Sequence, residues 1–450
     1  MSVWSILRMF HDLSLGYFYL FLNDQFLYFK LHYFKRVLQL FPRLRFKKFD
    51  GDWEKTTIGA KSETVTSGSR DWAQYYSDSG DKFIRMTNLV RNGINLDLSD
   101  LRFVQLPVGS NEGKRTSLEK GDILISITAE LGKLGWIPEG LGTAYINQHT
   151  ALVRMKNTLD SKFVAYALST EKYNNKLNSL NDSGAKAGLN LGSIRSFELT
   201  IPSKPEQTQI ASFLSVVDEK ISQLTQKLEL LSQYKQGMMQ KLFSQQVRFK
   251  ADDGSEFGEW EEKLIKDIAD VKGGKRIPKG YPLVNENTGH PYITVSDMNR
   301  SYSIDSTNIR YVPLEVVDTI KRYTITDKDI FISVAGTLGI IGKIPTEFNG
   351  ANLTENADKL TNLKCHQDFL IYLLDSGYLS ELIESTATTS AQPKLALYAI
   401  EQLEVQIPCP EEQTKIANFL SAIDQKIEVV AQQIEQAKTW KKGLLQQMFI

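Results

Sequence analysis

The feature that most constrains this 450-residue chain is a long helical pattern that occurs twice, 206 residues apart. The motif Ile-Pro-x-x-x-Glu-Gln-Thr-x-Ile-Ala-x-Phe-Leu-Ser begins at Ile201 and again at Ile407. In both copies apolar residues then recur at steps of three and four, which is the spacing of a helix that buries one face. A match of this length predicts that the chain is built from two related halves, each ending in a long helix.

The apolar faces of the two helices predict that they pack against each other as a coiled coil. We expect antiparallel packing, because the segment between the helices then need not span their whole length. The alternative is that each helix lies on the surface of its own domain. The expected seam residues are Ile221, Leu224, Leu228, Leu231, Met238 and Leu242 in the first helix, and Ile427, Val430, Ile434, Ala437, Leu444 and Met448 in the second.

Both copies place a lysine at the one interrupted step of the seam, Lys235 in the first and Lys441 in the second. In an antiparallel pair these lysines lie toward opposite ends. We therefore expect them to border a partner or the ends of the helix pair, rather than to face each other.

The starts of the two helices carry different signals. Ser203 and Glu206 have the spacing of a capping box, in which two side chains satisfy free backbone N–H groups. Cys409 replaces the serine in the second copy, where the following proline and acidic pair favour a helix start.

Charge and cysteine content restrict the class of protein. Lysine and arginine number 53, and aspartate and glutamate also number 53, so the chain lacks the overall basic character of a general nucleic-acid coat. Local basic loops remain compatible with this balance. The two cysteines, Cys365 and Cys409, offer neither a disulfide framework nor a metal-ligand set, so we expect a cytoplasmic protein without a metal site.

The first 42 residues are rich in aromatic side chains and differ from the rest of the chain. Polar residues at positions 23–25 interrupt the apolar run, whereas a membrane span needs about 20 mostly apolar residues. The segment also lacks the basic start and small-residue cleavage site of a secretory signal. We therefore expect residues 1–42 to form an extension outside the core fold, and we expect no membrane association.

The repeat divides the remaining chain into four parts. Residues 43–202 and 247–407 are predicted to form mixed α/β globular domains, and residues 203–246 and 408–450 the helices that follow them. Within the globular domains, the apolar segments 122–127 and 329–334 predict buried strands that precede glycine turns. The predicted fold class is α+β, with two mixed α/β domains separated and joined by an antiparallel coiled coil of two long helices.

Polar and basic loops lie where the two globular domains differ most. Glycine lets a backbone approach a phosphate closely, lysine and arginine neutralise it, and arginine, asparagine or glutamine can read base edges. A solvated loop without a ligand is the alternative for each, and residues 147–149 are expected to hold two strands together instead. The candidate DNA-contacting residues are Ser69, Arg70, Arg85, Thr87, Asn88 and Lys186 in the first domain, and Lys272, Lys275, Arg276, Lys279, Thr294, Ser296, Gln392 and Lys394 in the second.

Several catalytic signatures are missing from the chain. No Pro-Pro dipeptide marks the adenine-gripping motif of an amino-methyltransferase, and no Gly-Lys pair is followed by serine or threonine as in a nucleotide-binding loop. Asp218-x-Lys220 and Asp424-x-Lys426 have the spacing of a nuclease fragment, but they fall on the predicted helices and are interpreted as helix surface. We therefore assign no catalytic residue and no metal ligand.

These motifs resemble the specificity subunit of type I restriction-modification systems. The resemblance covers roughly residues 42–450, and it rests on the Ile-Pro, Glu-Gln-x-x-Ile-Ala-x-Phe-Leu and Asp-x-x-Ile patterns at 201–221 and 407–427. It implies two target-recognition domains that bind double-stranded DNA. It further implies two methyltransferase subunits and restriction subunits as partners, which use S-adenosylmethionine, ATP and Mg²⁺, while this chain binds no cofactor and is not an enzyme.

The geometry of two helices suggests how such a chain could measure DNA. A seam of about 26 residues is roughly 40 Å long, and one turn of B-DNA separates half-sites by about 34–36 Å. The helix pair could therefore act as a ruler between two halves of an asymmetric target. The alternatives are a coiled-coil scaffold whose lobes bind proteins, and a nuclease that acts alone.

Overall fold

The computed structural model describes residues 27–28, 42–180, 188–387 and 394–449. The chain divides into unit 1, which contains Met1–Gln223 and Ile434–Ile450, and unit 2, which contains Leu224–Gln433. Most of the predicted N-terminal extension lies outside the described residues. The backbone of β1 (Leu27–Tyr28) within it pairs antiparallel with β2 (Arg45–Phe46).

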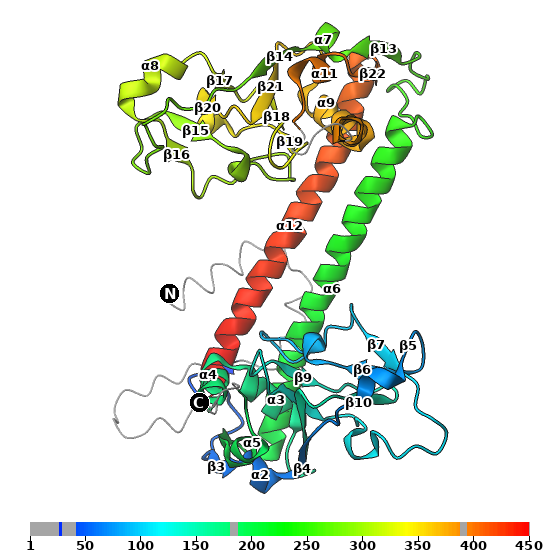
Figure 1. Cartoon of the computed structure of the whole chain (residues 1–450), viewed down its shortest axis with the longest axis vertical. Helices are drawn as coiled ribbons and strands as arrows, with labels where there is room; N and C mark the ends of the chain where they lie inside the picture. Colours follow the sequence, from blue (N-terminus) through cyan, green and yellow to red (C-terminus); the bar gives the residue numbers. More distant parts are fainter. Residues whose placement is uncertain (1–26, 29–41, 181–187, 388–393, 450) are drawn as a thin grey trace. The chain divides into compact units, whose positions relative to one another are not determined.

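Two long helices, α6 (Lys204–Phe243) and α12 (Pro410–Met448), confirm the helical prediction (Figure 1). Unit 1 pairs the first half of α6 with the last part of α12, and unit 2 pairs the second half of α6 with the first part of α12. The helices therefore run antiparallel. Of the twelve expected seam residues, Leu224, Leu242, Val430, Ile434, Leu444 and Met448 are buried, and Ile221, Leu228, Leu231, Met238, Ile427 and Ala437 are half-buried.

Unit 1 is built on two four-stranded sheets. One has the order β4-β11-β8-β9 and the other the order β10-β6-β7-β5, in which β10 and β6 are parallel. The strands are β4 (Ser62–Ser67), β5 (Tyr76–Ser77), β6 (Asp81–Ile84), β7 (Arg102–Val104), β8 (Ile123–Ser126), β9 (Leu134–Trp136), β10 (Ala144–Ile146) and β11 (Thr150–Met155). A further pair, β3 (Glu54–Thr57) and β12 (Glu198–Ile201), and the helices α2 (Ile58–Lys61), α3 (Ser161–Ser169), α4 (Glu171–Ser179) and α5 (Leu191–Ser196) complete the unit.

Unit 2 repeats this plan. Its sheets have the orders β14-β21-β18-β19 and β16-β15-β20-β17, and β15 and β20 form the parallel pair. The strands are β14 (Asp270–Gly273), β15 (Pro291–Ile293), β16 (Arg310–Tyr311), β17 (Thr324–Ile325), β18 (Ile330–Ser333), β19 (Ile341–Gly342), β20 (Ala351–Leu353) and β21 (Ala357–Thr361), with the pair β13 (Glu261–Leu264) and β22 (Glu404–Ile407). The helices are α7 (Ile265–Ile268), α8 (Val317–Ile320), α9 (Gln367–Leu373), α10 (Leu379–Ala387) and α11 (Leu397–Glu401), with a wide turn, Leu374–Tyr378, between α9 and α10.

The two strands predicted from their apolar sequences are confirmed. All four residues of β8 and all four of β18 are buried. The aspartate before each strand is also buried, and each is paired: Asp122 accepts from Arg154 at 2.8 Å, and Asp329 from Lys359 at 3.0 Å. Pairing allows a carboxylate to remain charged inside the domain.

The start of each long helix is tied to the segment that precedes its domain. Glu206 accepts hydrogen bonds from Arg45 at 2.6 and 2.7 Å, and Glu412 accepts from Arg248 at 3.1 and 2.7 Å. Both carboxylate oxygens of Glu206, which was expected to form a capping box with Ser203, are thus bonded to Arg45. The carboxylate of Glu206 is buried against an arginine, because a bidentate ion pair satisfies it better than one backbone N–H group.

As expected, the seam lysines lie toward opposite ends of the helix pair and do not face each other: Lys235 is eight residues before the end of α6, and Lys441 is seven before the end of α12. Their ion pairs within the helix pair were not predicted. The side chains of Lys235 and Lys441 are each only 12% exposed, and each contacts an aspartate of the other long helix. Lys235 lies 2.6 Å from Asp424, and Lys441 lies 2.5 Å from Asp218. The interpretation of these two aspartates as ordinary helix surface is therefore wrong.

None of the described helices has the length and apolar character needed to cross a membrane. Within the described part of the chain, histidine, cysteine, aspartate and glutamate side chains form no group of three or more that could hold a metal ion.

Candidate nucleic-acid interface

Several of the candidate DNA-contacting residues lie at the carboxyl ends of the parallel strand pairs: Ser69, Arg70, Arg85, Thr87 and Asn88 in unit 1, and Lys275, Arg276, Thr294 and Ser296 in unit 2. In unit 1, Ile84 of β6 lies beside Ile146 of β10, so the loops that follow both strands start at the same edge. In unit 2, Ile293 of β15 lies beside Leu353 of β20 in the same way. This edge is where the ligand-binding loops of α/β sheets usually meet.

A short turn crosses this edge in unit 2. The N–H of Lys275 donates to the carbonyl of Leu353 at 2.8 Å, and the hydroxyl of Tyr292 donates to the carbonyl of Lys275 at 2.8 Å. A Cβ atom on Gly274 would lie 2.0 Å from the carbonyl oxygen of Thr354, so only glycine fits there. The backbone of this turn is therefore held firmly, while the side chain of Arg276 is 76% exposed.

The same turn occurs in unit 1, 206 residues earlier. A Cβ atom on Gly68 would lie 2.1 Å from the carbonyl oxygen of Ile146. Ser69 forms an isolated bridge with Asn147, and the side chain of Arg70 is exposed. We call Gly68–Arg70 and Gly274–Arg276 the junction turns.

The junction turns correct the expected role of their glycines. We expected glycine to bring the backbone close to a phosphate. Gly68 and Gly274 instead bring it against carbonyl groups of the same chain. Each glycine thereby fixes the position from which the following arginine projects.

The arginine of the second junction turn is restrained by an acidic neighbour. Arg276 forms an ion pair with Glu355, two residues after β20. Burial favours a higher pKa for Glu355, but hydrogen bonds, chiefly from Arg276, outweigh it and hold the pKa below its usual value. The ammonium group of Lys275 lies 5.5 Å from the ring centre of Tyr323, within range of a cation–π interaction.

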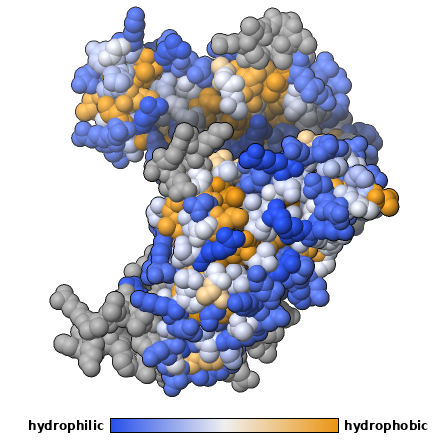
Figure 2. Space-filling model, turned by 60° about the horizontal axis from the view of Figure 1, so that its bottom comes forward, coloured by the Kyte–Doolittle hydropathy of each residue, from blue (hydrophilic) through white to orange (hydrophobic). Residues whose placement is uncertain are grey.

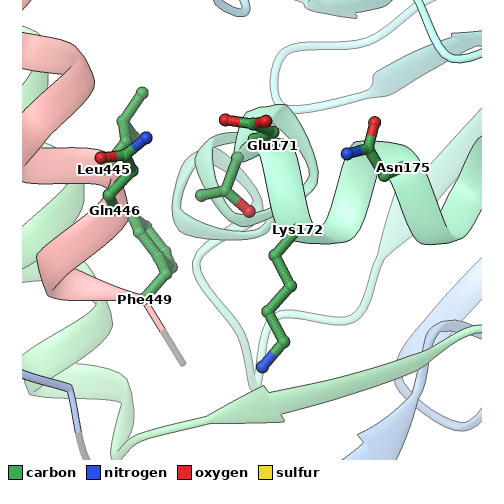
Figure 3. A pocket seen from close by; sticks show the side chains of 7 residues that line it. Glu171, Lys172, Asn175, Leu445, Gln446 and Phe449 are labelled. Carbon is green, nitrogen blue, oxygen red and sulfur yellow. The ribbon is translucent and has the colours of Figure 1, made fainter.

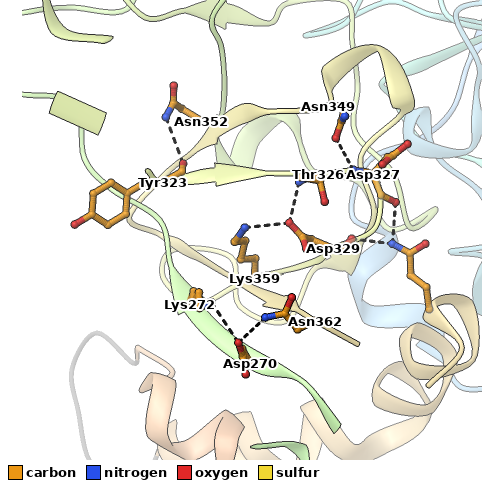
Figure 4. Close-up of polar contacts among 11 residues, drawn as sticks. Asp270, Lys272, Tyr323, Thr326, Asp327, Asp329, Asn349, Asn352, Lys359 and Asn362 are labelled. Carbon is orange, nitrogen blue, oxygen red and sulfur yellow. Dashed lines mark hydrogen bonds and ion pairs between the residues drawn. The ribbon is translucent and has the colours of Figure 1, made fainter. Parts of the chain in front are cut away.

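The other basic candidates of unit 2 are exposed. Lys272 lies on β14, with its ammonium group 3.3 Å from Asp270, which also accepts a 2.7 Å hydrogen bond from Asn362 (Figure 4). Lys279 lies in the loop after the junction turn. Lys394 lies close enough to the buried Asp358 to influence its carboxyl group electrostatically.

Asp358 is a buried carboxylate close to this edge. It lies on β21 opposite Gly273, and its residue is only 6% exposed. Burial raises the pKa of Asp358 to about 6, against an opposing effect of Lys394. At neutral pH the carboxylate therefore offsets part of the positive charge that Lys394 offers to a ligand.

Three candidate residues hold the protein together instead of projecting toward a ligand. The amide of Asn88 is buried, accepts from the N–H of Arg85 at 2.9 Å and donates to the carbonyls of Asp97 and Asp100 at 2.8 and 3.3 Å. Arg85 itself is bound to the carboxylate of Asp100 at 2.7 Å. Assigning Asn88 as a base reader is therefore wrong, since its donors and acceptor are already used.

Thr294 is the equivalent case in unit 2. Its hydroxyl donates to Asp297 at 2.6 Å within a single helical turn, Val295–Asp297, and its N–H donates to the same carboxylate at 2.7 Å. Thr87 and Ser296 are exposed on the two equivalent turns. Lys186 and Gln392 lie outside the described residues.

Sequence reasoning missed two residues at this edge. Arg115 is exposed and donates to the hydroxyl of Thr66, two residues before the first junction turn. The basic pair that follows Gly113 could have indicated it. Glu355 had no local signal, because it is 79 residues from the arginine that it restrains.

A groove recurs at equivalent places in the two units. In unit 1 it has a volume of about 370 Å³ and lies between the start of α4 and the end of α12 (Figure 3). In unit 2 it has a volume of about 590 Å³ and lies between the end of α6 and the wide turn before α10. Gln240 and Phe243 of the second groove correspond to Gln446 and Phe449 of the first, 206 residues later.

The surface seen in Figure 2 is mostly hydrophilic, and hydrophobic residues occupy smaller areas of it. Because basic and acidic residues are equal in number, the chain has no net positive charge that would attract DNA. A contact with a phosphate backbone would therefore depend on local basic groups such as those of the junction turns.

The sequence matches the family described as "Type I restriction modification DNA specificity domain" twice, over residues 51–233 and 258–439. It is 27% identical to the putative type I restriction enzyme MjaX specificity subunit of Methanocaldococcus jannaschii, over 91% of this chain and 96% of that protein. It is 23% identical to the type I restriction enzyme EcoKI specificity subunit of Escherichia coli, over 87% of this chain and 85% of that protein.

A solved structure supports the same architecture. The crystal structure of a type I restriction-modification S subunit from M. genitalium has a TM-score of 0.58 and 18% identity, covering 88% of this chain and 96% of that one. This likeness concerns the fold. Because the family match spans both halves of the sequence, the chain belongs to the type I restriction modification DNA specificity domain family.

Proposed function

We propose that each unit reads one half of a bipartite, asymmetric sequence in double-stranded DNA, and that the long helices set the spacer between the halves. The observation that carries this proposal is the equivalent placement of Arg70 and Arg276, each exposed and each following a glycine packed on a parallel strand pair. An arginine projecting from a fixed backbone can bind a phosphate or the edge of a guanine.

The two readers carry different side chains on this common frame. At the middle position of the junction turn, unit 1 has Ser69 and unit 2 has Lys275. On the equivalent turns that follow the parallel strands, the exposed residue is Thr87 in unit 1 and Ser296 in unit 2. The two units thus share one backbone arrangement but carry different side chains on it, which favours a target whose two halves differ in sequence.

The catalytic work would belong to partner subunits. In this proposal methyltransferase subunits supply S-adenosylmethionine chemistry on adenine, and restriction subunits supply ATP- and Mg²⁺-dependent cleavage, all in the cytoplasm. The chain itself would direct them without a catalytic residue or a cofactor. The recurring groove supports two copies of one partner, because the same surface is present once in each unit.

Co-expression with the cognate methyltransferase subunit tests the function. Sequencing that detects methylated adenine should give one bipartite motif that depends on this chain, and native mass measurement should give two methyltransferase subunits per chain. Methylation without a chain-dependent motif would refute the reading role. Duplex binding by the complex should weaken steeply as salt rises, whereas a protein-binding scaffold would show no duplex affinity.

The ruler is tested by length. Inserting four residues within 220–241, with a matching insertion in α12, should lengthen the spacer of the methylated motif. A spacer that stays unchanged while methylation persists would contradict the role of the helices.

A further inference from the structure

Lys235 sits in a cluster that joins three elements of unit 2. Its ammonium group lies 2.6 Å from the carboxylate of Asp424 on α12 and 3.0 Å from the hydroxyl of Tyr302. Tyr372 of α9 donates to the same Asp424 at 2.6 Å, and Tyr302 donates to Asp375 at 2.6 Å. The lysine also lies over the rings of both tyrosines, 4.3 and 5.1 Å from their centres.

Unit 1 contains the lysine, aspartate and helix tyrosine of this cluster, with the two long helices exchanged. Lys441 of α12 lies 2.5 Å from Asp218 of α6, and Tyr166 of α3 donates to Asp218 at 2.8 Å. The side chains of Lys441 and Asp218 are only 12% and 10% exposed. Each cluster therefore links both long helices to a helix of the globular domain.

Both clusters require the same alignment of the two helices. Asp218 and Lys235 are 17 residues apart on α6, and Asp424 and Lys441 are 17 residues apart on α12. A single antiparallel register therefore satisfies both ion pairs. The apolar seam alone is less selective, because it repeats every seven residues and can be matched again after a slip of about 10 Å.

A slip would leave charges without partners inside the protein. Lys235 and Lys441 are each 12% exposed, and a largely buried charge that loses its partner is strongly destabilising, so a slipped register would be penalised at two places. Burial, reinforced by the neighbouring carboxylates, raises the pKa values of Tyr166 and Tyr372 well above the usual range. Both tyrosines therefore remain hydrogen-bond donors to the aspartates at any physiological pH.

We propose that the two Lys–Asp–Tyr clusters lock the axial register of α6 and α12, and thereby determine the spacer length of the DNA sequence that the complex recognises. The second part rests on the proposed function. Lys235, Lys441, Asp218 and Asp424 are then positioning residues, which set specificity without touching DNA.

The register can be measured on the full chain with two spin labels in unit 2. Cys365 and Cys409 are first replaced by alanine and serine, and cysteines are placed at the exposed Ser232 of α6 and Thr414 of α12. Pulsed electron resonance then gives the distance between the labels. The locked chain should give one narrow peak.

Apolar replacement removes the lock while it keeps volume. One variant carries Lys235→Met, Asp424→Leu and Tyr372→Phe, and a second makes the same three types of change at Lys441, Asp218 and Tyr166. Well-packed apolar groups often replace a buried ion pair without loss of stability. The combined variant should show a second distance about 10 Å from the first, and each single-cluster variant a smaller fraction of it.

The controls separate the lock from a general loss of stability. Lys227→Met removes an exposed lysine from the same helix and should leave one peak. Lys235→Arg keeps the charge and should also leave one peak. A single unshifted peak in every folded apolar variant, including the single-cluster ones, would overturn the proposed lock.

The methylated motif then tests the link to specificity. Variants with two distances should methylate motifs with more than one spacer length, whereas reduced stability alone would lower the yield of methylation at the original spacer. Two distances with one unchanged spacer would overturn the role in specificity. If the unmodified complex methylates no bipartite motif, the proposed function fails while the distance measurement still decides the register lock.

Discussion

Replacing Arg276 by alanine removes the exposed guanidinium group of the second junction turn and leaves the backbone of that turn in place. The carbonyl and N–H of Lys275 hold the turn, and neither depends on the arginine side chain. Arg70→Ala is the equivalent change in unit 1. Both variants should fold normally, because both side chains are exposed.

The size of the effect follows from the contact that is lost. A bidentate arginine–guanine contact contributes about 1–3 kcal/mol, which corresponds to roughly 5- to 150-fold in affinity. In the unmodified protein, Arg276 must give up its ion pair with Glu355 to bind DNA, which costs little because an exposed pair contributes about 0–1 kcal/mol. We therefore expect each alanine variant to bind the target at least about fivefold more weakly.

The assay is duplex binding by the assembled methyltransferase complex, measured by fluorescence anisotropy at several salt concentrations on the motif found by methylation sequencing. If Arg276 contacts a phosphate, Arg276→Ala should reduce the slope of the salt dependence by about one unit. Arg276→Lys should then keep most of the binding affinity. A base contact should be lost in Arg276→Lys, because lysine lacks the planar fork. Arg276→Lys should then also lower the sequence specificity at one position of one half-site.

Lys426→Ala is the matched control, because it removes an exposed positive charge from α12 of the same unit. The reasoning is refuted if Arg70→Ala and Arg276→Ala both keep the affinity, salt slope and motif of this control. An effect of Arg276→Ala on the half-site read by unit 1 alone would refute the assignment of one half-site to each unit.

Three further changes test the surroundings of the junction turns. Gly274→Ala should lower the free energy of unfolding by about 1–3 kcal/mol or more, because its Cβ would lie 2.0 Å from a backbone oxygen, whereas Gly258→Ala meets nothing within 4 Å and should be neutral in thermal unfolding. Asp358→Asn should raise the free energy of unfolding at pH 7 by about 2–3 kcal/mol. The pKa of Asp358 is about 6 in the folded protein and 3.8 in the unfolded chain. The contribution of Asp358 to stability is therefore complete below pH 3.8 and is lost as the pH rises through 6. A denaturation series from pH 4 to 8 would contradict this if the variant and the parent changed in parallel. Glu355→Gln should free Arg276 and tighten duplex binding up to about fivefold, and unchanged binding would show that the ion pair does not restrain the arginine.

The sequence predicted the parts of the fold that depend on local periodicity. The bounds of α6 and α12, the buried strands β8 and β18 and the glycines after them all follow from residues close together in the chain. The periodic pattern also indicated which helix faces are buried. It could not indicate how the two lysines at the interrupted steps are satisfied, because their aspartate partners are contributed by the other helix.

The candidate site was predicted only in part for the same reason. A polar side chain in a loop has the same local signature whether it faces solvent or holds the loop together. Asn88 differs from Thr87 because two carbonyls, at Asp97 and Asp100, fold back over its amide. Arg276 differs from Lys279 because strand pairing brings Glu355 beside it. Such contacts depend on tertiary structure and leave no periodic trace.

The division between repeated and divergent residues explains how one chain can combine a fixed frame with a variable target. The contacts that recur in both units are structural. They are the arginine–glutamate pair at the start of each long helix, the ring contacts Trp53–Phe163 and Trp260–Phe369 in the two cores, and the Lys–Asp–Tyr clusters. The proposed DNA-binding edge repeats its glycine and arginine, but most of its other candidate side chains differ. If the proposed function holds, substitutions at this edge change the bases that are read without disturbing the helix register. Changes in the clusters should alter the spacer and leave each half-site as it was.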